Sequence, residues 1–435
     1  MSEEAKKEAE KKPAPEPKPE PKDVLVETHH SLSIGGQEIQ YTVTAGTIVM
    51  KEETEARDKE SEGEKPKAIF FFVAYTKDGV EDIHNRPLTF SFNGGPGSAS
   101  VWLHLGLLGP RRVVMGDAGS LLPPPCSLTD NEFSLLDRTD LVFIDPVSTG
   151  YSRPVEGQKA VEYHGTKKDI ASVGDFIRLY TTRYGRWLSP KFLIGESYGT
   201  TRAAGLSGYL QDRHGLYLNG IMLISAVLDF STLEFEPGND LPYVLFLPTY
   251  AAIARYHGKV RSRQPLAKYL QLVAAFAEGE YSQALARGSS LGQLESRRIA
   301  ERLAHYSGLS SDYIQRTNLR VEIFRFCKEL LRDRRRTVGR IDGRFLGMDR
   351  DAAGETIQTD PSMDAISGPY TAALYDYVRP RAQIRIRPAL RGPDPQGLAL
   401  DLHRGRQPLP ERRRDPAPCA QHQPPPARAC RQRLL

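Results

Sequence analysis

Three short apolar runs that end in turn residues constrain the fold of this chain more than any other feature. They span residues 88–92, 141–144 and 192–194. Runs this short and uniformly apolar are typical of parallel strands that are covered on both faces. Between the second and the third run, apolar residues recur at helical spacing from Ile170 to Tyr180, which predicts an amphipathic crossover helix. The sequence therefore predicts a right-handed β-α-β unit within an α/β fold.

Neighbouring segments extend the predicted sheet. Gly35-Gly36 separates two runs in which apolar residues alternate at period two, and this pattern predicts a β-hairpin. Residues 69–73 form another continuous apolar strand, which follows a charged loop over residues 51–64. The third run should lead into a helix that extends through Leu210, and residues 221–228 should form a further strand.

Composition divides the chain into segments. Residues 1–23 alternate Lys, Glu, Pro and Ala without an aromatic residue, which predicts a disordered leader. Residues 24–234 contain the predicted strands and helices of an α/β core. Residues 235–346 are helical with no clear strand, and we expect a cap inserted over the carboxyl edge of the sheet, where α/β folds bind ligands. Residues 347–378 should return to the core.

The last segment, residues 379–435, differs from the rest of the chain. It is rich in Arg and Pro and contains no Lys, Phe, Tyr, Trp, Ser, Thr or Asn. A Pro-rich unfolded tail and a coding region read out of frame both explain this composition, and the missing Ser, Thr and Lys favour the second interpretation. We expect the last strands of the sheet to be missing, so that one sheet edge is exposed and the protein tends to aggregate.

Charge and composition argue against several classes of partner. The formal net charge of +5 does not indicate nucleic-acid binding, because the excess Arg lies in the last segment without aromatic residues. No apolar run approaches the roughly 18 residues that span a bilayer, so no membrane association is expected. The chain begins with MSEEAKKEAEKK and not with an apolar signal, which predicts a cytoplasmic protein as written, or an exported one if the start codon is misplaced.

The cysteines indicate neither a metal site nor a cofactor. Their spacing matches no metal-ligand pattern, and we expect free thiols at Cys126, Cys327, Cys419 and Cys430. The oligomeric state cannot be read from the sequence.

The pentapeptide Gly195-Glu196-Ser197-Tyr198-Gly199 follows one predicted strand and precedes a predicted helix. In this context two glycines permit a sharp turn that lifts the serine hydroxyl clear of the sheet, and the helix N-terminus stabilises developing negative charge. A plain structural turn is the alternative. The strand and helix favour Ser197 as a catalytic nucleophile.

A second glycine-rich loop, Asn93-Gly94-Gly95-Pro96-Gly97, follows the strand at 88–92. An acyl-transfer enzyme needs two backbone N–H groups that converge on the carbonyl oxygen, and a Gly-Gly turn allows this close approach. We predict that Gly95 and Tyr198 supply these two N–H groups as an oxyanion hole. A phosphate loop is the alternative, but no Lys-Ser/Thr follows the glycines.

Three motifs together resemble the serine carboxypeptidase family: NGGPGSAS at 93–100, FIDPVSTGYS at 143–152 and GESYG at 195–199. The resemblance covers residues 24–378. It implies an α/β-hydrolase fold and an enzyme that removes C-terminal residues from peptides through an acyl-enzyme. It also implies that Asn93 and Glu196 hydrogen-bond the terminal carboxylate of the substrate. A glutamate donates such a bond only when protonated, which is why the family favours acidic pH.

This chain departs from the family pattern in two places. The family usually has a second carboxylate about a dozen residues after the glycine-rich loop, whereas residues 102–108 contain no acid. The family also has its catalytic Asp and His after the helical insertion, but the histidines found there, His403 and His422, lie in the Arg/Pro segment without a preceding strand. We identify neither partner of Ser197 from the sequence. Asp229 is a geometrically possible acid without support from the family.

Three functions remain open at this point. The first is a serine carboxypeptidase whose Asp and His are not identifiable in this chain. The second is a non-catalytic protein that keeps the pocket and binds peptide ends. The third is an esterase or acyltransferase on the same scaffold, since the fold does not determine the substrate. Asn93 next to Glu196 favours a peptide carboxylate over an ester.

Overall fold

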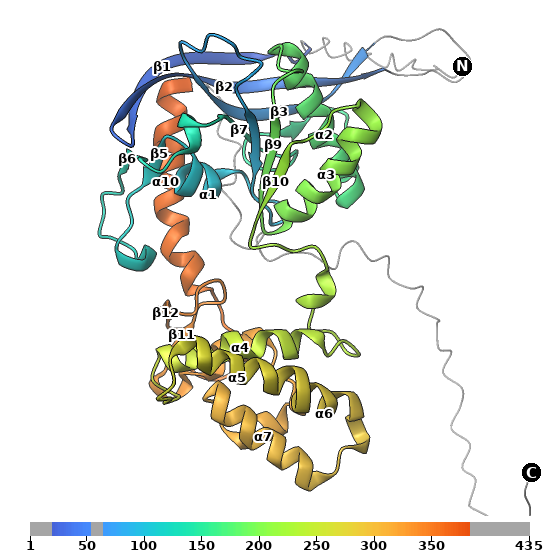
Figure 1. The fold of residues 1–435 in the computed structure, drawn as a ribbon, viewed down its shortest axis with the longest axis vertical. Coiled ribbons are helices and arrows are strands. Elements are labelled where there is room, and N and C mark those ends of the chain that lie inside the picture. Colours follow the sequence, from blue (N-terminus) through green and yellow to red (C-terminus); the bar gives the residue numbers. More distant parts are fainter. Residues whose placement is uncertain (1–19, 54–63, 383–435) are drawn as a thin grey trace, which may run out of the picture. The chain divides into compact units, whose positions relative to one another are not determined.

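The computed structural model describes residues 20–53 and 64–382, and its chief feature is one eight-stranded sheet (Figure 1). The strands of this sheet are β1 (Val24–Ile34), β2 (Gln37–Glu53), β3 (Glu64–Lys77), β4 (Leu88–Phe92), β7 (Asp140–Ile144), β8 (Arg153–Pro154), β9 (Lys191–Glu196) and β10 (Gly220–Ile224). Their order is β1-β2-β3-β7-β4-β9-β10, with β8 paired to β3. Strands β7, β4, β9 and β10 are parallel, whereas β1, β2 and β3 pair antiparallel.

The helices are α1 (Val101–Leu103), α2 (Thr166–Arg183), α3 (Tyr198–His214), α4 (Leu241–Tyr256), α5 (Leu266–Phe276), α6 (Ser282–Arg287), α7 (Gln293–Ser307), α8 (Ser311–Arg316), α9 (Ile323–Glu329) and α10 (Pro361–Ala382). Two π-helical turns cover His104–Leu108 and Ala277–Tyr281. Short 3₁₀ turns lie at Asp117–Gly119, Leu135–Asp137, Ala160–Tyr163, Phe230–Thr232, Gly288–Ser290 and Arg332–Arg334. Two small hairpins pair β5 (Arg111–Val113) with β6 (Leu128–Asp130) and β11 (Thr337–Val338) with β12 (Leu346–Gly347).

The predicted sheet elements are confirmed, with shifts at their ends. The hairpin turns at Gly35-Gly36, where Ile34 pairs with Gln37. Strand β4 has the predicted bounds, and α2 and α3 stand at the predicted helices. Strand β3 begins at Glu64, so part of the predicted charged loop is strand, and residues 54–63 lie outside the described residues. The strand predicted for 221–228 ends early at Ile224, because Ser225 turns the chain with a φ of 52°.

Alternation along β3 explains why this strand reads as a continuous apolar run. Phe70 and Phe72 pack on one face of the sheet against α2, where Phe176 stacks on Phe70 at 5.1 Å between ring centroids. Phe71 and Tyr75 point to the opposite face, which also holds residues of α10. Both faces of the strand are therefore buried, as expected for a central strand of an α/β sheet.

Strand β10 is the last strand of the sheet among the described residues. Two of its side chains are exposed, Ile221 by 36% and Met222 by 39%. This agrees with the expected exposed edge, and the tendency to aggregate stays a prediction.

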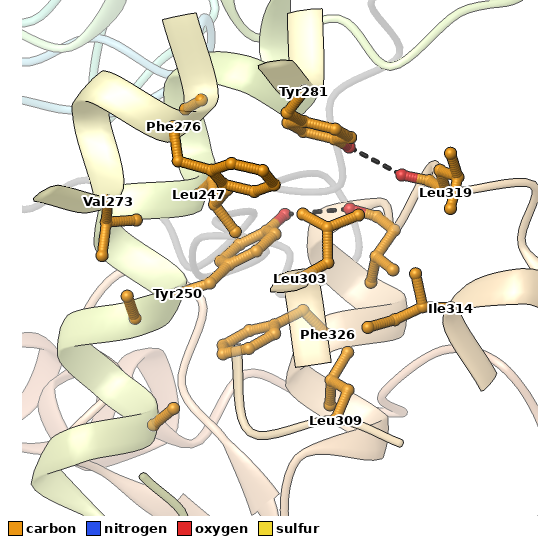
Figure 2. Packing of buried hydrophobic residues seen from close by; sticks show 14 of the residues in the cluster. Leu247, Tyr250, Val273, Phe276, Tyr281, Leu303, Leu309, Ile314, Leu319 and Phe326 are labelled. Carbon is orange, nitrogen blue, oxygen red and sulfur yellow. Dashed lines mark hydrogen bonds between the residues drawn. The ribbon is translucent and has the colours of Figure 1, made fainter. Parts of the chain in front are cut away.

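The helical segment from α4 to α9 has its own apolar cluster, shown in Figure 2. Tyr250 of α4 stacks on Phe326 of α9 with ring centroids 4.0 Å apart. The hydroxyl of Tyr281 donates to the carbonyl of Leu319 at 2.6 Å. The prediction that no strand interrupts residues 235–346 is wrong in one detail, because the two-residue strand β11 forms there. All described residues fall into one compact unit, so the predicted boundaries at 234 and 346 stay predictions.

Both predicted terminal boundaries move slightly. Asp23, assigned to the leader, accepts a hydrogen bond from Val49 N at 2.7 Å and pairs with Arg183. Helix α10 buries Tyr377 and Val378 in the sheet cluster, as the predicted return to the core requires, and then continues to Ala382. The first four residues of the predicted tail are therefore helical, because the apolar contacts of α10 carry the helix past residue 378. Residues 1–19 and 383–435 lie outside the described residues.

Candidate active site

Ser197 lies between β9 and α3, in a backbone conformation that serine rarely adopts. Its φ is 56° and its ψ is −126°. Such a conformation costs on the order of 1–3 kcal/mol in a residue with a side chain, and it persists only where the surroundings enforce it. Here Ser197 N donates to Ile224 O at 2.9 Å, and Thr200 N donates to Ser197 O at 2.9 Å. The predicted sharp turn between strand and helix is confirmed.

The two glycines of the turn are required by close backbone contact. A Cβ on Gly195 would lie 2.1 Å from Gly199 O, and a Cβ on Gly199 would lie 2.8 Å from Phe92 O. Both contacts involve main-chain atoms, which cannot rotate away. Any other residue at position 195 would push strand β9 and helix α3 apart.

The glycine-rich loop after β4 packs directly against the Ser197 turn. A Cβ on Gly94 would lie 2.4 Å from Tyr198 N and 2.6 Å from Glu196 O. Gly95 has a φ of 105°, which favours glycine. The structure therefore brings together the two segments that carry the predicted donors, Gly95 and Tyr198. Their role as an oxyanion hole stays a prediction.

Asn93 and Glu196 lie side by side, but the amide of Asn93 is already largely used. Its Nδ2 donates to Glu196 Oε2 at 3.0 Å, and its Oδ1 accepts from the backbone N–H groups of Trp102 and Leu103 at 3.1 Å each. Asn93 is fully buried. Because an amide nitrogen has two hydrogens, one donor remains for a ligand. The predicted role of this pair in carboxylate binding stays a prediction.

Sequence reasoning missed a buried ion pair that lies beneath this loop. Arg202 on α3 donates from Nε to Asp169 Oδ2 at 2.8 Å and from Nη2 to Asp169 Oδ1 at 3.2 Å. Its Nη1 donates to the carbonyl of Asn93 at 2.8 Å. A signal for it was available, since Arg202 shares a helix face with Leu206 and Leu210, and a charge on an apolar face needs a partner.

Asp145 is a further residue whose role sequence reasoning missed, although it lies in the motif at 143–152. It follows β7 and is buried, and its Oδ1 accepts from Ser100 N at 2.9 Å while its Oδ2 accepts from Tyr151 N at 3.4 Å. A Cβ on Gly150 would lie 1.8 Å from Asp145 Oδ2. Burial raises the pKa of Asp145 to about 6, against the lowering effects of these two backbone hydrogen bonds and of Arg153. Asp145 thus ties the start of α1 to the loop of residues 146–152.

Within the described part of the chain, no histidine is hydrogen-bonded to Ser197 as a catalytic base would be. No hydrogen bond joins Ser197 Oγ to any residue there. His104 bonds to the hydroxyl of Tyr75, and burial lowers its pKa to about 3, while His214 pairs with Asp175. His403 and His422 lie outside the described residues.

Asp229 is exposed and caps the short turn at Phe230–Thr232. The side chain of Ser231 lowers the pKa of Asp229, and the backbone hydrogen bond from Ser231 N to Asp229 Oδ1 at 2.9 Å lowers it further. The structure thus gives Asp229 a local capping role, and no contact with a histidine is seen among the described residues.

The site contains no group of side chains suited to a metal ion, as far as residues 20–53 and 64–382 are concerned. Of the four cysteines, Cys126 is exposed and Cys327 is buried, both as free thiols, whereas Cys419 and Cys430 lie outside the described residues. Across the same ranges, no helix is both long and apolar enough to cross a bilayer.

A cavity of about 310 Å³ lies at the opposite end of the strands from Ser197. It is lined by Trp187, Lys191 and Tyr217 among others, at the amino ends of β9 and β10. Open α/β sheets bind their ligands at the carboxyl ends of the strands, where Ser197 lies. We therefore assign the candidate site to the Ser197 turn.

Comparison with known proteins bears directly on this arrangement. Residues 59–233, which contain the glycine turn, the Asp145 loop and the Ser197 turn, match the family described as serine carboxypeptidase. This part of the chain is similar to the serine carboxypeptidase family. Its sheet order and crossing helices agree with the α/β-hydrolase fold that the family resemblance implies.

Curated relatives are serine carboxypeptidase-like proteins of Arabidopsis thaliana. Serine carboxypeptidase-like 29 is 26% identical over 181 residues, which cover 38% of this chain and 33% of that protein. Serine carboxypeptidase-like 33 is 27% identical over 163 residues, which cover 35% of this chain and 30% of that protein. The chain thus spans about a third of the length of the curated relatives it matches.

Among solved structures, a prohormone-processing carboxypeptidase from Saccharomyces cerevisiae aligns with 60% of this chain and 53% of its own, at 21% identity and a TM-score of 0.33. A peroxisomal α/β-hydrolase from the same organism aligns with 59% of this chain and 62% of its own, at 12% identity and a TM-score of 0.24.

Proposed function

We propose that this protein is a serine-type carboxypeptidase that releases C-terminal residues from peptides through an acyl-enzyme at Ser197. The observation that carries the proposal is the strained backbone of Ser197 at the N-terminus of α3, with the Gly94-Gly95 turn packed against it. Strain of this kind is maintained at functional sites. The match of residues 59–233 to the serine carboxypeptidase family supports the same chemistry.

The proposed reaction begins with attack of Ser197 Oγ on the carbonyl carbon of the last peptide bond. The carbonyl oxygen gains negative charge, which the N–H groups of Gly95 and Tyr198 stabilise together with the N-terminus of α3. The peptide C–N bond then breaks, and the leaving amine takes the proton that Ser197 Oγ gave up on attack. Water later hydrolyses the acyl-enzyme, which releases the shortened peptide as an acid and returns a proton to Ser197 Oγ. Asn93 and Glu196 would bind the terminal carboxylate, which selects the last residue of the peptide.

Attack by a serine hydroxyl requires a base, and in this fold the base is a histidine. Because no described histidine bonds to Ser197, a second candidate function stands beside the first. It is a non-catalytic protein that binds peptide ends at the same pocket. The two functions share the site and differ in turnover.

Covalent labelling separates the two candidates. We would treat the 435-residue chain with a fluorophosphonate probe and assay it on N-blocked dipeptides between acid and neutral pH. The same assays would be run on a version whose segment after residue 378 is translated from an alternative frame of the gene. Ser197→Ala should abolish labelling and turnover, whereas Ser207→Ala, the same change within the helix that follows Ser197, should keep both.

The outcomes point in different directions. Labelling and turnover that require Ser197 in either version support the carboxypeptidase. If only the 435-residue chain is active, His403 and His422 become the candidates for the base. If neither version labels, while both bind a peptide that has a free carboxylate and not its amide, the peptide-binding protein replaces the enzyme.

A further inference from the structure

Arg202 makes an unusual set of contacts for a charged residue. It is 1% exposed, and every part of its guanidinium group is engaged. Nε and Nη2 bind both oxygens of Asp169 on α2, and Nη1 binds the carbonyl of Asn93. Its flat face lies over the rings of Phe92 and Tyr198, at 5.2 Å from each centroid. One side chain thus contacts the loop before Gly95 and the residue after Ser197.

Stability alone does not account for this ion pair. Removing two charges from water costs several kcal/mol for each ion, and well-packed apolar residues often replace buried pairs without loss of stability. What a planar guanidinium adds is direction, because its donors are set in a rigid fork. Here the fork aligns the Asn93 carbonyl with Asp169, and so determines the orientation of the Asn93-Gly94 peptide plane.

A second buried arginine cluster provides a comparison. Arg186 and Arg86 both pair with Asp140 at 2.6 Å, and Arg186 Nη2 donates to Arg86 O at 2.8 Å. This cluster lies at the amino ends of β4 and β7, and it has the same chemistry and similar burial. It touches neither the glycine turn nor the Ser197 turn.

We propose that Arg202, held by Asp169, is a positioning residue for the oxyanion site. Its guanidinium group binds the Asn93 carbonyl and packs on the Tyr198 ring, and so holds the two segments together. The N–H groups of Gly95 and Tyr198 then converge on one point. This inference rests on the proposed function at Ser197. The Tyr198 hydroxyl is also coupled to Asp169, and burial raises its pKa to about 12, so it stays neutral beside this carboxylate.

The test combines hydrogen exchange with labelling, in Arg202→Lys, Arg202→Met and Asp169→Asn. Lysine keeps the charge but cannot bind Asp169 through two donors and Asn93 O at once. We expect amide exchange over residues 93–97 to become at least about tenfold faster, while β4 and β9 stay protected. The maximal rate of fluorophosphonate labelling should fall by about 100-fold, with little change in the half-saturating probe concentration.

Arg186→Lys is the matched control. It makes the same substitution in a cluster of similar burial, and it should lower the unfolding midpoint without faster exchange at 93–97 or slower labelling. Parent-like exchange over 93–97 in folded Arg202→Lys and Asp169→Asn proteins would overturn the positioning role. If the parent chain does not label at all, the proposed function fails, and the exchange measurement still decides the role of Arg202. Asp169→Asn is the mildest variant and keeps the test valid if Arg202→Met does not fold.

Discussion

At the carboxyl ends of β4 and β9, backbone touches backbone, whereas in the helical segment from α4 to α9 side chains fill the space between helices. A Cβ on Gly94 would come within 2.4 Å of Tyr198 N. In the helical cluster, by contrast, Tyr250 and Phe326 are stacked (Figure 2). The first region has no space for a side-chain atom at Gly94, because the neighbouring atoms are backbone. The second depends on large apolar side chains, and tolerates added atoms at its surface.

The two regions also treat charge differently. Beneath the Ser197 turn, Arg202 and Asp169 are both buried and joined to the backbone of the glycine loop. In the helical segment most ion pairs are exposed, such as Arg316 with Asp312. Exposed pairs contribute roughly 0–1 kcal/mol, whereas breaking a buried pair costs about 3–5 kcal/mol. Burial alone does not distinguish the site, because Lys328 on α9 and Asp349 also form a buried pair. What distinguishes the pair of Arg202 and Asp169 is its hydrogen bond to the backbone of the glycine loop.

The largest effect that we expect comes from removing volume in the helical cluster. Phe326 is fully buried, so Phe326→Ala should lower the free energy of unfolding by about 4 kcal/mol, as large-to-small core changes do. Urea unfolding measures this change. Phe324→Ala is the control, since Phe324 is 37% exposed and should lose about 1 kcal/mol or less. Equal losses in the two variants would contradict the assignment of the cluster.

The next effect comes from adding volume at the site. Gly195→Ala places a Cβ 2.1 Å from Gly199 O, so we expect a loss of roughly 3 kcal/mol and a Ser197 turn that no longer labels. Gly279→Ala adds the same methyl group in the helical segment, where no atom lies within 4 Å. That control should be neutral or stabilising by up to about 1 kcal/mol. Similar stability of both variants would contradict the view that backbone packing is tighter at Gly195 than at Gly279.

The smallest effect that we expect is a pH dependence of the free energy of unfolding, and it comes from Asp145 near the candidate site. Burial raises the pKa of Asp145 from 3.8 to about 6, so its contribution to stability is fully present below pH 3.8 and is lost as pH rises through 6. Between pH 4 and pH 7.5 this amounts to about 2 kcal/mol, since one pKa unit corresponds to about 1.4 kcal/mol.

Asp145→Asn isolates that contribution. The asparagine keeps an acceptor for Ser100 N but cannot ionise. Unfolding by urea at a series of pH values should show the parent losing stability relative to Asp145→Asn as pH rises. A constant difference between the two proteins from pH 4 to pH 7.5 would mean that Asp145 has the same pKa in the folded and unfolded chain, so that burial does not raise it.

Much of the sheet could be predicted because its strands are read from local pattern. Strand β4 has the predicted bounds, and the hairpin turns at the predicted Gly35-Gly36. Strand β10 was predicted too long, since nothing in its apolar run indicates that Ser225 adopts a positive φ. The turn there depends on Thr200 and Thr201, which hydrogen-bond to the backbone of Val227 from another element.

In the candidate site, too, the locally encoded features could be predicted and the tertiary contacts could not. The sequence by itself determined Ser197, Gly95, Tyr198, Asn93 and Glu196 as the candidate residues, because glycine-rich turns after strands are local features. Only the tertiary structure decided that Asn93 Oδ1 accepts hydrogen bonds from the first turn of α1, and that Arg202, paired with Asp169, binds the backbone carbonyl of Asn93. The physical reason is that a buried polar group is defined by its partners, and these partners come from β4, α2 and α3, which are far apart in the chain and adjacent only after folding.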